Sequence, residues 1–257
     1  MSRGFRGLQS DQLRWSMKGR FTFPLVLLTL LGGSFLAVRY AERQYPEHLP
    51  WTALDLDHPI GTFTGRKLSA LAGEPLQCHQ LLKDVHSDFR IVPSRADGPH
   101  CGYEEAVRFS SGEEWSVDYN PRSPVLSCPL AASLVLWERA VVQPAARRHL
   151  GSPIKDIRHF GSYACRRLYG ERSGGWSEHA RANAIDIGRF DLADGRRISV
   201  AASWNRGTVE QEAFLREVRD GACQLFATVL GPDYNEAHQD HFHLDQASRG
   251  AAWRMCR

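Results

Sequence analysis

Residues 184–202 read AIDIGRFDLADGRRISVAA, a pattern typical of a β-hairpin. Mixed apolar and polar residues flank Asp194-Gly195 on both sides, and an Asp-Gly pair between two such runs is a strong signal for a tight turn. The predicted strands are 184–190 and 197–202. The sequence therefore predicts an antiparallel strand pair in the C-terminal half of the chain.

Amphipathic helices are predicted on both sides of this hairpin. Before it, apolar residues recur every three or four positions over 127–150, and Pro144 is expected to bend or shorten this helix. After it, Thr208 and Gln211 form a capping-box pattern that opens a second helix, which Gly231 is expected to end. Each helix has one apolar face that must be buried against another element.

Further short strands are predicted at 161–166 and around 241–244. Strands that cluster in the last hundred residues, with helices packed to one side, favour an α+β domain built on a small antiparallel sheet with flanking helices. We expect this domain to occupy residues 127–257. The preceding residues 61–126 contain a helical pattern at 67–82 and are expected to form a small disulfide-pinned subdomain.

The N-terminal part carries a membrane signal. Residues 21–38 are uncharged and follow a basic segment, residues 1–20, which predicts a transmembrane helix with a cytoplasmic N-terminus. A cleaved signal peptide, with a cleavage site near Gly32-Gly33-Ser34, and a buried core helix are the alternatives. Residues 39–60 are rich in proline, charge and aromatics and are predicted to be a tether.

Charge and cysteine content narrow the function classes. Five basic residues and Asp11 give residues 1–38 a charge of +4, which leaves −1 of the total +3 for the rest, so nucleic-acid binding is not expected. Hydrophobic residues at 42% and charged residues at 24% exclude the disordered and fibrous classes. All six cysteines follow the apolar segment, which is typical of an oxidising compartment, and proximity favours a Cys78–Cys101 pair.

Two segments hold four of the eleven histidines, SEHARANAID at 177–186 and HQDHFHLD at 238–245. His179 and Asp186 can reach one ion if a loop carrying the first leads into a strand carrying the second. His241 and His243 are two apart and share one face of a strand. Because two imidazoles and one carboxylate are a common ligand set of catalytic zinc, His179, Asp186 and His243 are the predicted Zn²⁺ ligands. The alternative is histidines that are simply solvated or packed in the core.

These segments resemble the zinc peptidase superfamily that includes D-alanyl-D-alanine carboxypeptidases, murein endopeptidases, lysostaphin-type enzymes and the hedgehog domain. From Pro50 onward, the chain more closely resembles the bacterial extensin-like family, on PWTALDL, GSYACR and VLGPD besides the two histidine segments. No Ser-Pro-Pro-Pro-Pro repeat occurs, so a plant-type structural extensin is not expected. Ala182 stands where many relatives have glycine. The resemblance implies a zinc-centred fold of the carboxypeptidase and hedgehog type, with peptidoglycan as the substrate.

The resemblance also suggests acid/base residues. Asp240 matches a glutamate of the carboxypeptidase branch, whereas His241 and His238 match extra histidines of the murein endopeptidase branch. On a regular strand Asp240 would face away from the metal, so His241 assisted by His238 is favoured, with Asp240 as alternate base or as orienter of a ring. Arg166, on its predicted strand, is the candidate for binding the oxyanion or a stem-peptide carboxylate, and Tyr163 is a weaker one.

The predicted function is a membrane-anchored periplasmic zinc peptidase that hydrolyses amide bonds of peptidoglycan stem peptides or cross-links through a zinc-activated water. It would be a single-pass inner-membrane protein, or periplasmic if the N-terminal segment is cleaved. The alternative is a zinc-stabilised, inactive peptidoglycan-binding module. An acid/base set of His238, Asp240 and His241 favours the enzyme.

Overall fold

The computed structural model describes residues 10–85, 89–109, 117–248 and 254–257, with side chains from residue 23 onward. The chain divides into two compact units, Met1–Thr52 and Ala53–Arg257. The side chains of the basic segment 1–20 lie outside the described residues, so the predicted cytoplasmic tail is not described. Each unit is considered by itself below.

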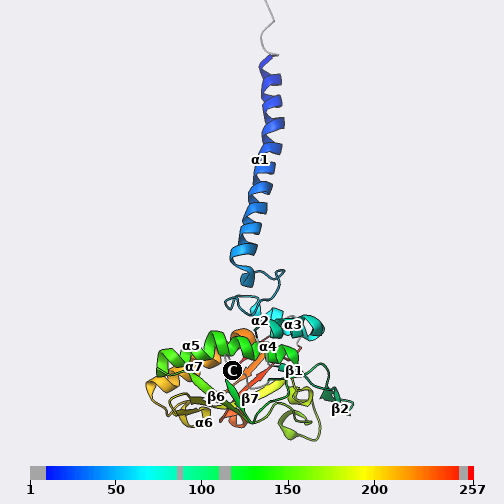
Figure 1. Ribbon diagram of the computed structural model, residues 1–257. Helices are drawn as coiled ribbons and strands as arrows, with labels where there is room; N and C mark the ends of the chain where they lie inside the picture. The colour runs from blue at the N-terminus through cyan, green and yellow to red at the C-terminus, as the bar shows by residue number, and fades with distance from the viewer. Residues whose placement is uncertain (1–9, 86–88, 110–116, 249–253) are drawn as a thin grey trace, which may run out of the picture. The chain divides into compact units, whose positions relative to one another are not determined.

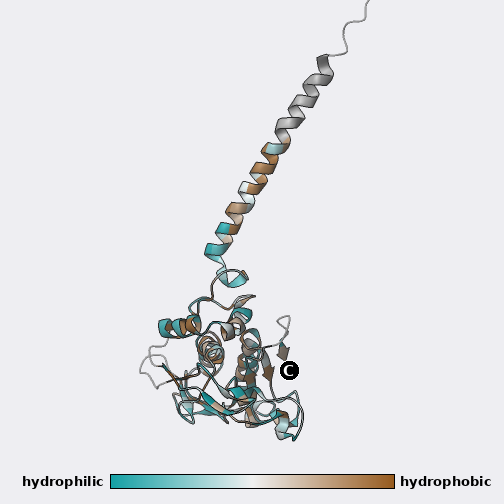
Figure 2. Ribbon diagram, turned by 90° about the vertical axis from the view of Figure 1, so that its right-hand side faces the viewer, coloured by the Kyte–Doolittle hydropathy of each residue, from teal (hydrophilic) through white to brown (hydrophobic). Residues whose placement is uncertain are grey.

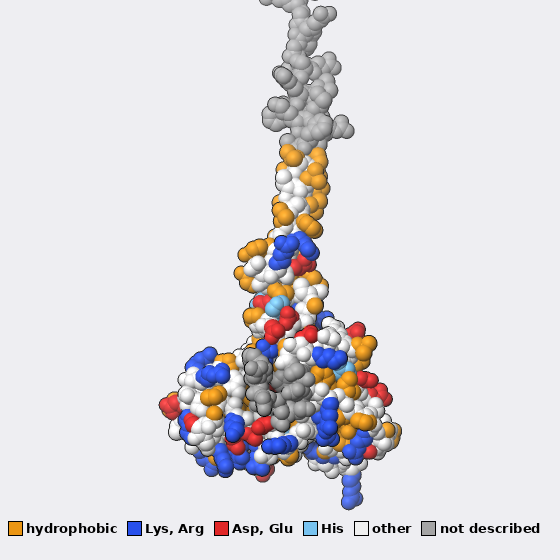
Figure 3. Space-filling model, viewed as in Figure 1, with side chains coloured by type: hydrophobic (Ala, Val, Ile, Leu, Met, Phe, Trp, Pro, Cys, Tyr) orange, Lys and Arg blue, Asp and Glu red, His pale blue; other side chains and the backbone are white. Residues whose placement is uncertain are grey.

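The first unit consists of helix α1 (Ser10–Gln44) followed by the short 3₁₀ helix η1 (Pro46–His48). Within α1, residues Phe23–Gln44 are long and apolar enough to cross a membrane, and none of the apolar window is buried in the protein. The ribbon of this part of the helix is coloured mostly as hydrophobic in Figure 2, and hydrophobic side chains cover much of it in Figure 3. The buried core helix is therefore excluded, and a membrane span and a signal sequence both agree with the structure.

The second unit is built on a seven-stranded sheet with the order β11-β9-β10-β7-β6-β5, to which β8 adds by pairing with β7. All pairs are antiparallel except β5 with β6 and β11 with β9. The prediction of an α+β fold is confirmed (Figure 1). The strands are β5 (Asp118–Asn120), β6 (Ile154–His159), β7 (Ala184–Leu192), β8 (Arg197–Ser199), β9 (Thr228–Leu230), β10 (Phe242–Asp245) and β11 (Met255–Cys256).

The predicted hairpin is confirmed as β7 and β8, and Gly195 in its turn has a φ of +89°, which glycine adopts without strain. The second arm is shorter than predicted because 200–203 form the helical turn α6 (Val200–Ser203). The predicted strand at 161–166 is wrong, since the strand in this region is β6. Gly161 has a φ of +146°, and the chain leaves the sheet there. Ala164 N–H then donates to the carbonyl of His179 at 3.0 Å, so this segment supports a neighbouring turn.

The helix predicted over 127–150 is one helical segment made of α4 (Cys128–Trp137), η3 (Glu138–Val142), α5 (Gln143–Ala145) and η4 (Ala146–Leu150). Pro144 does not end it, because the turns on both sides of α5 are π-helical and change the hydrogen-bond pattern around the missing N–H. The Gln143 side chain bonds Ile154 through both amide atoms, at 2.7 and 3.1 Å. The helical segment is therefore joined at Gln143 to the first residue of β6.

The second predicted helix is α7 (Val209–Leu225), and Thr208 and Gln211 form the expected capping box. The helix stops before Gly231, because 228–230 form strand β9, which lies between β11 and β10 near one edge of the sheet. Helices α4, α5 and α7 lie on one side of the sheet (Figure 1). Trp137 fills the space between the layers, with its ring 6.0 Å from that of Phe190 and its Nε1–H donating to the Val218 carbonyl at 2.9 Å.

The predicted helical pattern at 67–82 is split into two helices, since Pro75 begins a new one. Two small antiparallel strand pairs follow, and the β2–β3 hairpin lies in the connection between β1 and β4. The elements of this part are α2 (Thr64–Ala70), η2 (Leu71–Gly73), α3 (Pro75–Val85), β1 (Phe89–Ile91) paired with β4 (Val107–Phe109), and β2 (Arg95–Gly98) paired with β3 (Cys101–Tyr103).

The predicted Cys78–Cys101 disulfide is wrong. Cys78 pairs with Cys128, Cys101 with Cys165, and Cys223 with Cys256. The first pair joins α3 to the start of α4, because those helices pack together in the fold although they are far apart in sequence. Both cysteines of the 61–126 region are thus cross-linked to residues beyond it, and its apolar residues share the main core with 127–257.

Candidate metal centre

The centre begins with two facing residues on adjacent strands. In the antiparallel register of β7 and β10, Asp186 lies directly opposite His243, and its Oδ1 is 2.9 Å from the imidazole Nδ1. Directly opposed residues point their side chains to the same face of a sheet. The pairing therefore brings a carboxylate and an imidazole together from positions 57 residues apart.

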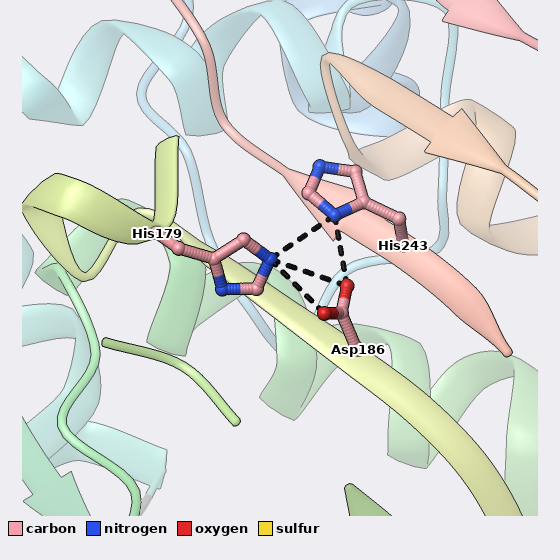
Figure 4. A group of neighbouring side chains, drawn as sticks. All are labelled: His179, Asp186 and His243. Atoms are coloured by element: carbon pink, nitrogen blue, oxygen red, sulfur yellow. Dashed lines mark hydrogen bonds and ion pairs between the residues drawn. The ribbon is translucent and has the colours of Figure 1, made fainter. Parts of the chain in front are cut away.

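His179 reaches the same place from a short helical turn, η6 (Glu178–Arg181). The Ser177 side chain caps this turn, and Ala182 leaves it with a φ of +53°, so that the chain reverses into β7. His179 Nε2 lies 3.2 Å from Asp186 Oδ1 and 3.3 Å from His243 Nδ1 (Figure 4). The structure thus brings together the three predicted ligands, with one atom of each within 4.8 Å of the others.

Outer partners select which ring nitrogen of each histidine carries hydrogen. The Ser162 carbonyl lies 3.3 Å from His179 Nδ1 and can only accept, so that nitrogen donates. The Asp245 carboxylate lies 3.1 Å from His243 Nε2 and in turn accepts from the Ala247 N–H at 2.9 Å. In the neutral rings the lone pairs are therefore on His179 Nε2 and His243 Nδ1, the two atoms that face Asp186.

With the rings in these neutral tautomers, three atoms that each offer an electron pair point toward one another, and no hydrogen lies between them. Such a set of atoms fits a cation. Atoms bound at about 2.1 Å around a tetrahedral Zn²⁺ lie roughly 3.4 Å apart, close to the observed separations of 2.9 to 3.3 Å. The donor set of two imidazoles and one carboxylate agrees with zinc chemistry, and the outer carbonyl and carboxylate are typical partners of metal-binding histidines. The residues present therefore fit a zinc ion.

The electrostatics of the metal-free cluster show the same demand for positive charge. Burial alone would raise the pKa of Asp186, but hydrogen bonds from His179 and His243 hold it well below its usual range. Burial lowers the pKa of His243, and hydrogen bonds to Asp186 and Asp245 outweigh it and raise the pKa to about 9. Both shifts reflect the attraction between the Asp186 carboxylate and positive charge beside it.

His241 lies just before β10 instead of within it, and its side chain still reaches the centre. Its Nε2 is 3.5 Å from Asp186 Oδ1, and its Nδ1 is 2.7 Å from Asp240 Oδ1. The side chain of Asp240 is 51% exposed and contacts the ring of His241. Of the two roles considered for Asp240, the geometry places it where it orients a ring.

His238, in the turn η7 (Glu236–His238), stands behind His241 with ring centroids 5.2 Å apart. Its Nδ1 lies 2.6 Å from Asn235 Oδ1, which can only accept, so the Nε2 lone pair is left available. Burial, together with the charges of His241 and His243, lowers the pKa of His238 to about 4. This ring is therefore neutral at physiological pH.

Arg166 and Tyr163 lie on the irregular segment after β6, not on a strand as expected. The carbonyl of Arg166 accepts from Ser177 N–H at 3.2 Å, and its guanidinium contributes to the lowered pKa of His238. Arg166 therefore stands within electrostatic range of the histidine pair. Tyr163 instead donates its hydroxyl to Asp97 Oδ2 at 2.5 Å.

Sequence reasoning assigned no role to Asp245, Asn235 or Phe160. Asp245 could have been found from strand alternation, since it is two residues after His243 on the same face. Phe160 lies with its ring centroid 5.8 Å from that of His241 and is 57% exposed. A Cβ on Gly188 would come within 2.4 Å of the Phe160 ring, so glycine is required for this packing. No local sequence pattern predicts that Asn235 or Phe160 contacts the histidine pair.

Comparison with known proteins gives one match. A family model described as "Extensin-like protein C-terminus" matches residues 76–257, which is more than half of the chain and includes every residue of the centre. No curated protein and no solved structure matches the chain significantly.

Proposed function

We propose that this chain, which belongs to the family of the extensin-like protein C-terminus, is a zinc-dependent peptidase that hydrolyses amide bonds in peptidoglycan. The observation that carries the proposal is the convergence of His179, Asp186 and His243 beside a second, oriented pair of histidines. A purely structural ion does not need a second pair of titratable side chains beside it. Hydrolysis needs groups that accept and return a proton.

His179, Asp186 and His243 would hold the zinc ion, leaving a tetrahedral ion one further position. When bound, zinc supplies a Lewis acid that polarises an amide carbonyl and lowers the pKa of water. Asp245 and the Ser162 carbonyl keep both imidazoles in the tautomers that the ion requires. The site is therefore ordered by the chain itself, which favours tight binding.

His241 is the proposed general base and acid. Asp240 accepts from its Nδ1–H at 2.7 Å, which leaves Nε2 free to take a proton at the edge of the cluster. An imidazole suits both proton transfers of amide hydrolysis, in which a proton leaves water and another reaches the departing amine. His238, held neutral by its lowered pKa, can share the proton of its neighbour.

Arg166 is the proposed partner for negative charge on the substrate. Its charge acts on His238, one of the two histidines of the acid/base pair. A guanidinium there can stabilise the oxyanion of the tetrahedral intermediate or pair with a carboxylate of the stem peptide. The Phe160 ring beside His241 would shield this side from water.

The cellular compartment in which peptidoglycan lies agrees with the disulfides and the apolar helix of this chain. Three disulfides indicate an oxidising compartment outside the cytoplasm, where peptidoglycan lies. The apolar part of α1 would anchor the protein in the inner membrane, or direct it to the periplasm if it is removed.

Digestion of purified sacculi tests the proposal. The full chain in detergent is incubated with sacculi in the presence of zinc, with a chelator, and as the His241→Ala variant, and muropeptides are separated by mass. We expect new peptide ends only with zinc and wild-type protein. Zinc-loaded protein that binds sacculi without changing their muropeptides would instead identify the inactive binding module.

A further inference from the structure

A cleft outside the metal centre has no role in the function described so far. It has a volume of about 690 Å³, and its wall is formed mainly by the continuous segment 90–95. Tyr103 on β3 and Arg108 on β4 close the other sides. The volume is within the range of about 300–1,000 Å³ that is typical of small-ligand sites, so the cleft suits a short peptide better than a polymer.

Among the described residues that line the cleft, arginines supply positive charge and no carboxylate balances it. Arg90 and Arg108 are directly opposite each other in the β1–β4 pair, an arrangement that is destabilising for like charges. Among the described residues, Arg108 donates to the Ser123 carbonyl at 3.2 Å, and the Arg90 guanidinium has no hydrogen-bond or ion-pair partner. No carboxylate is present among the described residues that line the cleft. An anion between the two guanidinium groups would remove the repulsion.

The third arginine is already neutralised. Arg95 Nε binds Asp97 Oδ2 at 2.7 Å, and its guanidinium lies 4.9 Å from the centre of the Tyr163 ring. Its position is fixed by the β2–β3 pair, where a Cβ on Gly102 would come within 2.0 Å of the Arg95 carbonyl. The anion-binding capacity of the cleft therefore belongs to Arg90 and Arg108.

The remaining lining is apolar. Ile91, Val92, Pro93 and the ring of Tyr103 lie beside the arginines, and Val92 is held by a backbone hydrogen bond to Ala106 at 2.9 Å. Figure 3 shows basic, acidic and hydrophobic side chains together over the region where β1 and β2 lie. Two guanidinium forks beside an apolar wall match a carboxylate on a short peptide with small apolar side chains.

The cleft is linked to the metal centre through a chain of contacts. Tyr103 packs edge-on against Tyr163 at 5.3 Å, and the adjacent Ser162 carbonyl accepts from His179 Nδ1. The Cys101–Cys165 disulfide joins β3 covalently to the same segment. A peptide held in the cleft would thus be anchored on an element that also supports a ligand of the metal.

We propose that the cleft between Arg90 and Arg108 binds the free carboxylates of a short peptide, and, resting on the proposed function, that this peptide is the stem peptide of peptidoglycan. The test measures binding without hydrolysis. The probe is the N-terminally labelled pentapeptide L-Ala-γ-D-Glu-L-Lys-D-Ala-D-Ala, as free acid and with both carboxylates amidated. The fluorescence anisotropy of the labelled peptide is measured as the full chain is added. The protein is kept in detergent, and a chelator is present so that no hydrolysis occurs.

The free acid is expected to bind at least tenfold more tightly than the diamide, since hydrogen bonds between charged groups contribute this much. The double variant Arg90→Gln/Arg108→Gln should bind both peptides equally, whereas Arg147→Gln, on an exposed helical turn, should keep the preference. Because Arg90 faces a like charge, Arg90→Gln alone should not lower the melting temperature, so a weaker acid preference in this single variant would not be caused by misfolding. A double variant Arg90→Lys/Arg108→Lys should show an intermediate preference.

Two results would overturn the proposal that the cleft binds carboxylates. One is equal affinity of the wild-type protein for the free acid and the diamide, and the other is a preference for the acid that persists in the Arg90→Gln/Arg108→Gln variant. Failure of the proposed function has a different signature. If sacculi are not cleaved but the preference for the free acid depends on both arginines, the cleft binds carboxylates and the proposed peptidase activity is wrong. If sacculi are cleaved and the preference for the free acid does not depend on the arginines, the peptidase activity is supported and the proposed role of the cleft is wrong.

Discussion

Asp186 and His243 face each other across the β7–β10 pair, with 2.9 Å between the carboxylate Oδ1 and the imidazole Nδ1. The register of the pair, not a loop, sets this contact. Backbone hydrogen bonds of a central sheet resist displacement, so two of the three ligands are held on rigid elements. Only His179 depends on a turn, and that turn is fixed by Ser177 and by the Ser162 carbonyl.

Replacing His243 by Ala should abolish zinc binding. The variant loses one of three ligand atoms and leaves Asp186 and His179 without their common neighbour. Zinc per chain, measured by elemental analysis after equilibrium dialysis of the full chain, is expected near one for wild type and near zero for the variant. His58→Ala, at a half-exposed residue that pairs with Asp55 and is not part of the centre, should bind like wild type. Full zinc occupancy in His243→Ala would contradict the assignment.

His241→Ala should separate binding from turnover. This ring contacts Asp186 only at 3.5 Å and is oriented by Asp240, so its loss leaves the three ligands in place. We expect unchanged zinc content and a rate of muropeptide release lower by roughly 10²–10⁴-fold, the usual contribution of a general base. A fully active His241→Ala would show that another group, Asp240 first, moves the proton.

Asp245→Asn tests the outer partner of His243. The substitution keeps the shape and an acceptor for Ala247 N–H but removes the charge beside His243 Nε2–H. Loss of such a partner lowers metal affinity by about 10–100-fold. Competition with a chromophoric chelator measures the zinc dissociation constant, and Asp84→Asn, at an exposed position of α3, is the matched control. Equal constants for wild type and Asp245→Asn would mean that the carboxylate does not orient the ring.

Glu138 should make the protein less stable as the pH rises. Burial raises its pKa from 4.5 to about 8, although the hydrogen bond from Tyr119 opposes this. Below pH 4.5 both folded and unfolded chains are protonated, so the stability is fully present there. Between pH 4.5 and about 8 the unfolded chain ionises first, so the free energy of unfolding falls by at most ~1.4 kcal/mol per pH unit.

Glu138→Gln keeps the buried acceptor for Tyr119 and cannot ionise, so it should lose this pH dependence and be the more stable protein above pH 8. Chemical denaturation of the full chain in detergent at several pH values gives the comparison, with Glu171→Gln as an exposed control. Parallel curves for wild type and Glu138→Gln would refute a neutral buried carboxyl group.

Features set by nearby residues were predictable from the sequence. The Asp194-Gly195 turn and the Thr208 capping box depend on backbone conformations that adjacent side chains select, and both occur as expected. His179 and Asp186 are close in sequence, so their meeting required only a turn into a strand. The α+β class followed from the same local patterns.

Features set by distant contacts were not predictable. The Cys78–Cys128 pair requires the packing of α3 on α4, and the departure of 161–166 from the sheet requires Gly161 and a neighbouring turn. The opposition of Asp186 and His243 depends on a strand register that no short segment encodes. The contact of Phe160 with His241 likewise needs Gly188 on another strand.

The central claim is amide hydrolysis that depends on the cluster of His179, Asp186 and His243. Digestion of sacculi by the zinc-loaded full chain in ¹⁸O-labelled water, followed by mass analysis of muropeptides, tests it most directly. The account predicts that each new peptide end carries one labelled oxygen in its new carboxylate, and that His243→Ala produces none. Sacculi left unchanged by wild-type protein that contains one zinc per chain would contradict it.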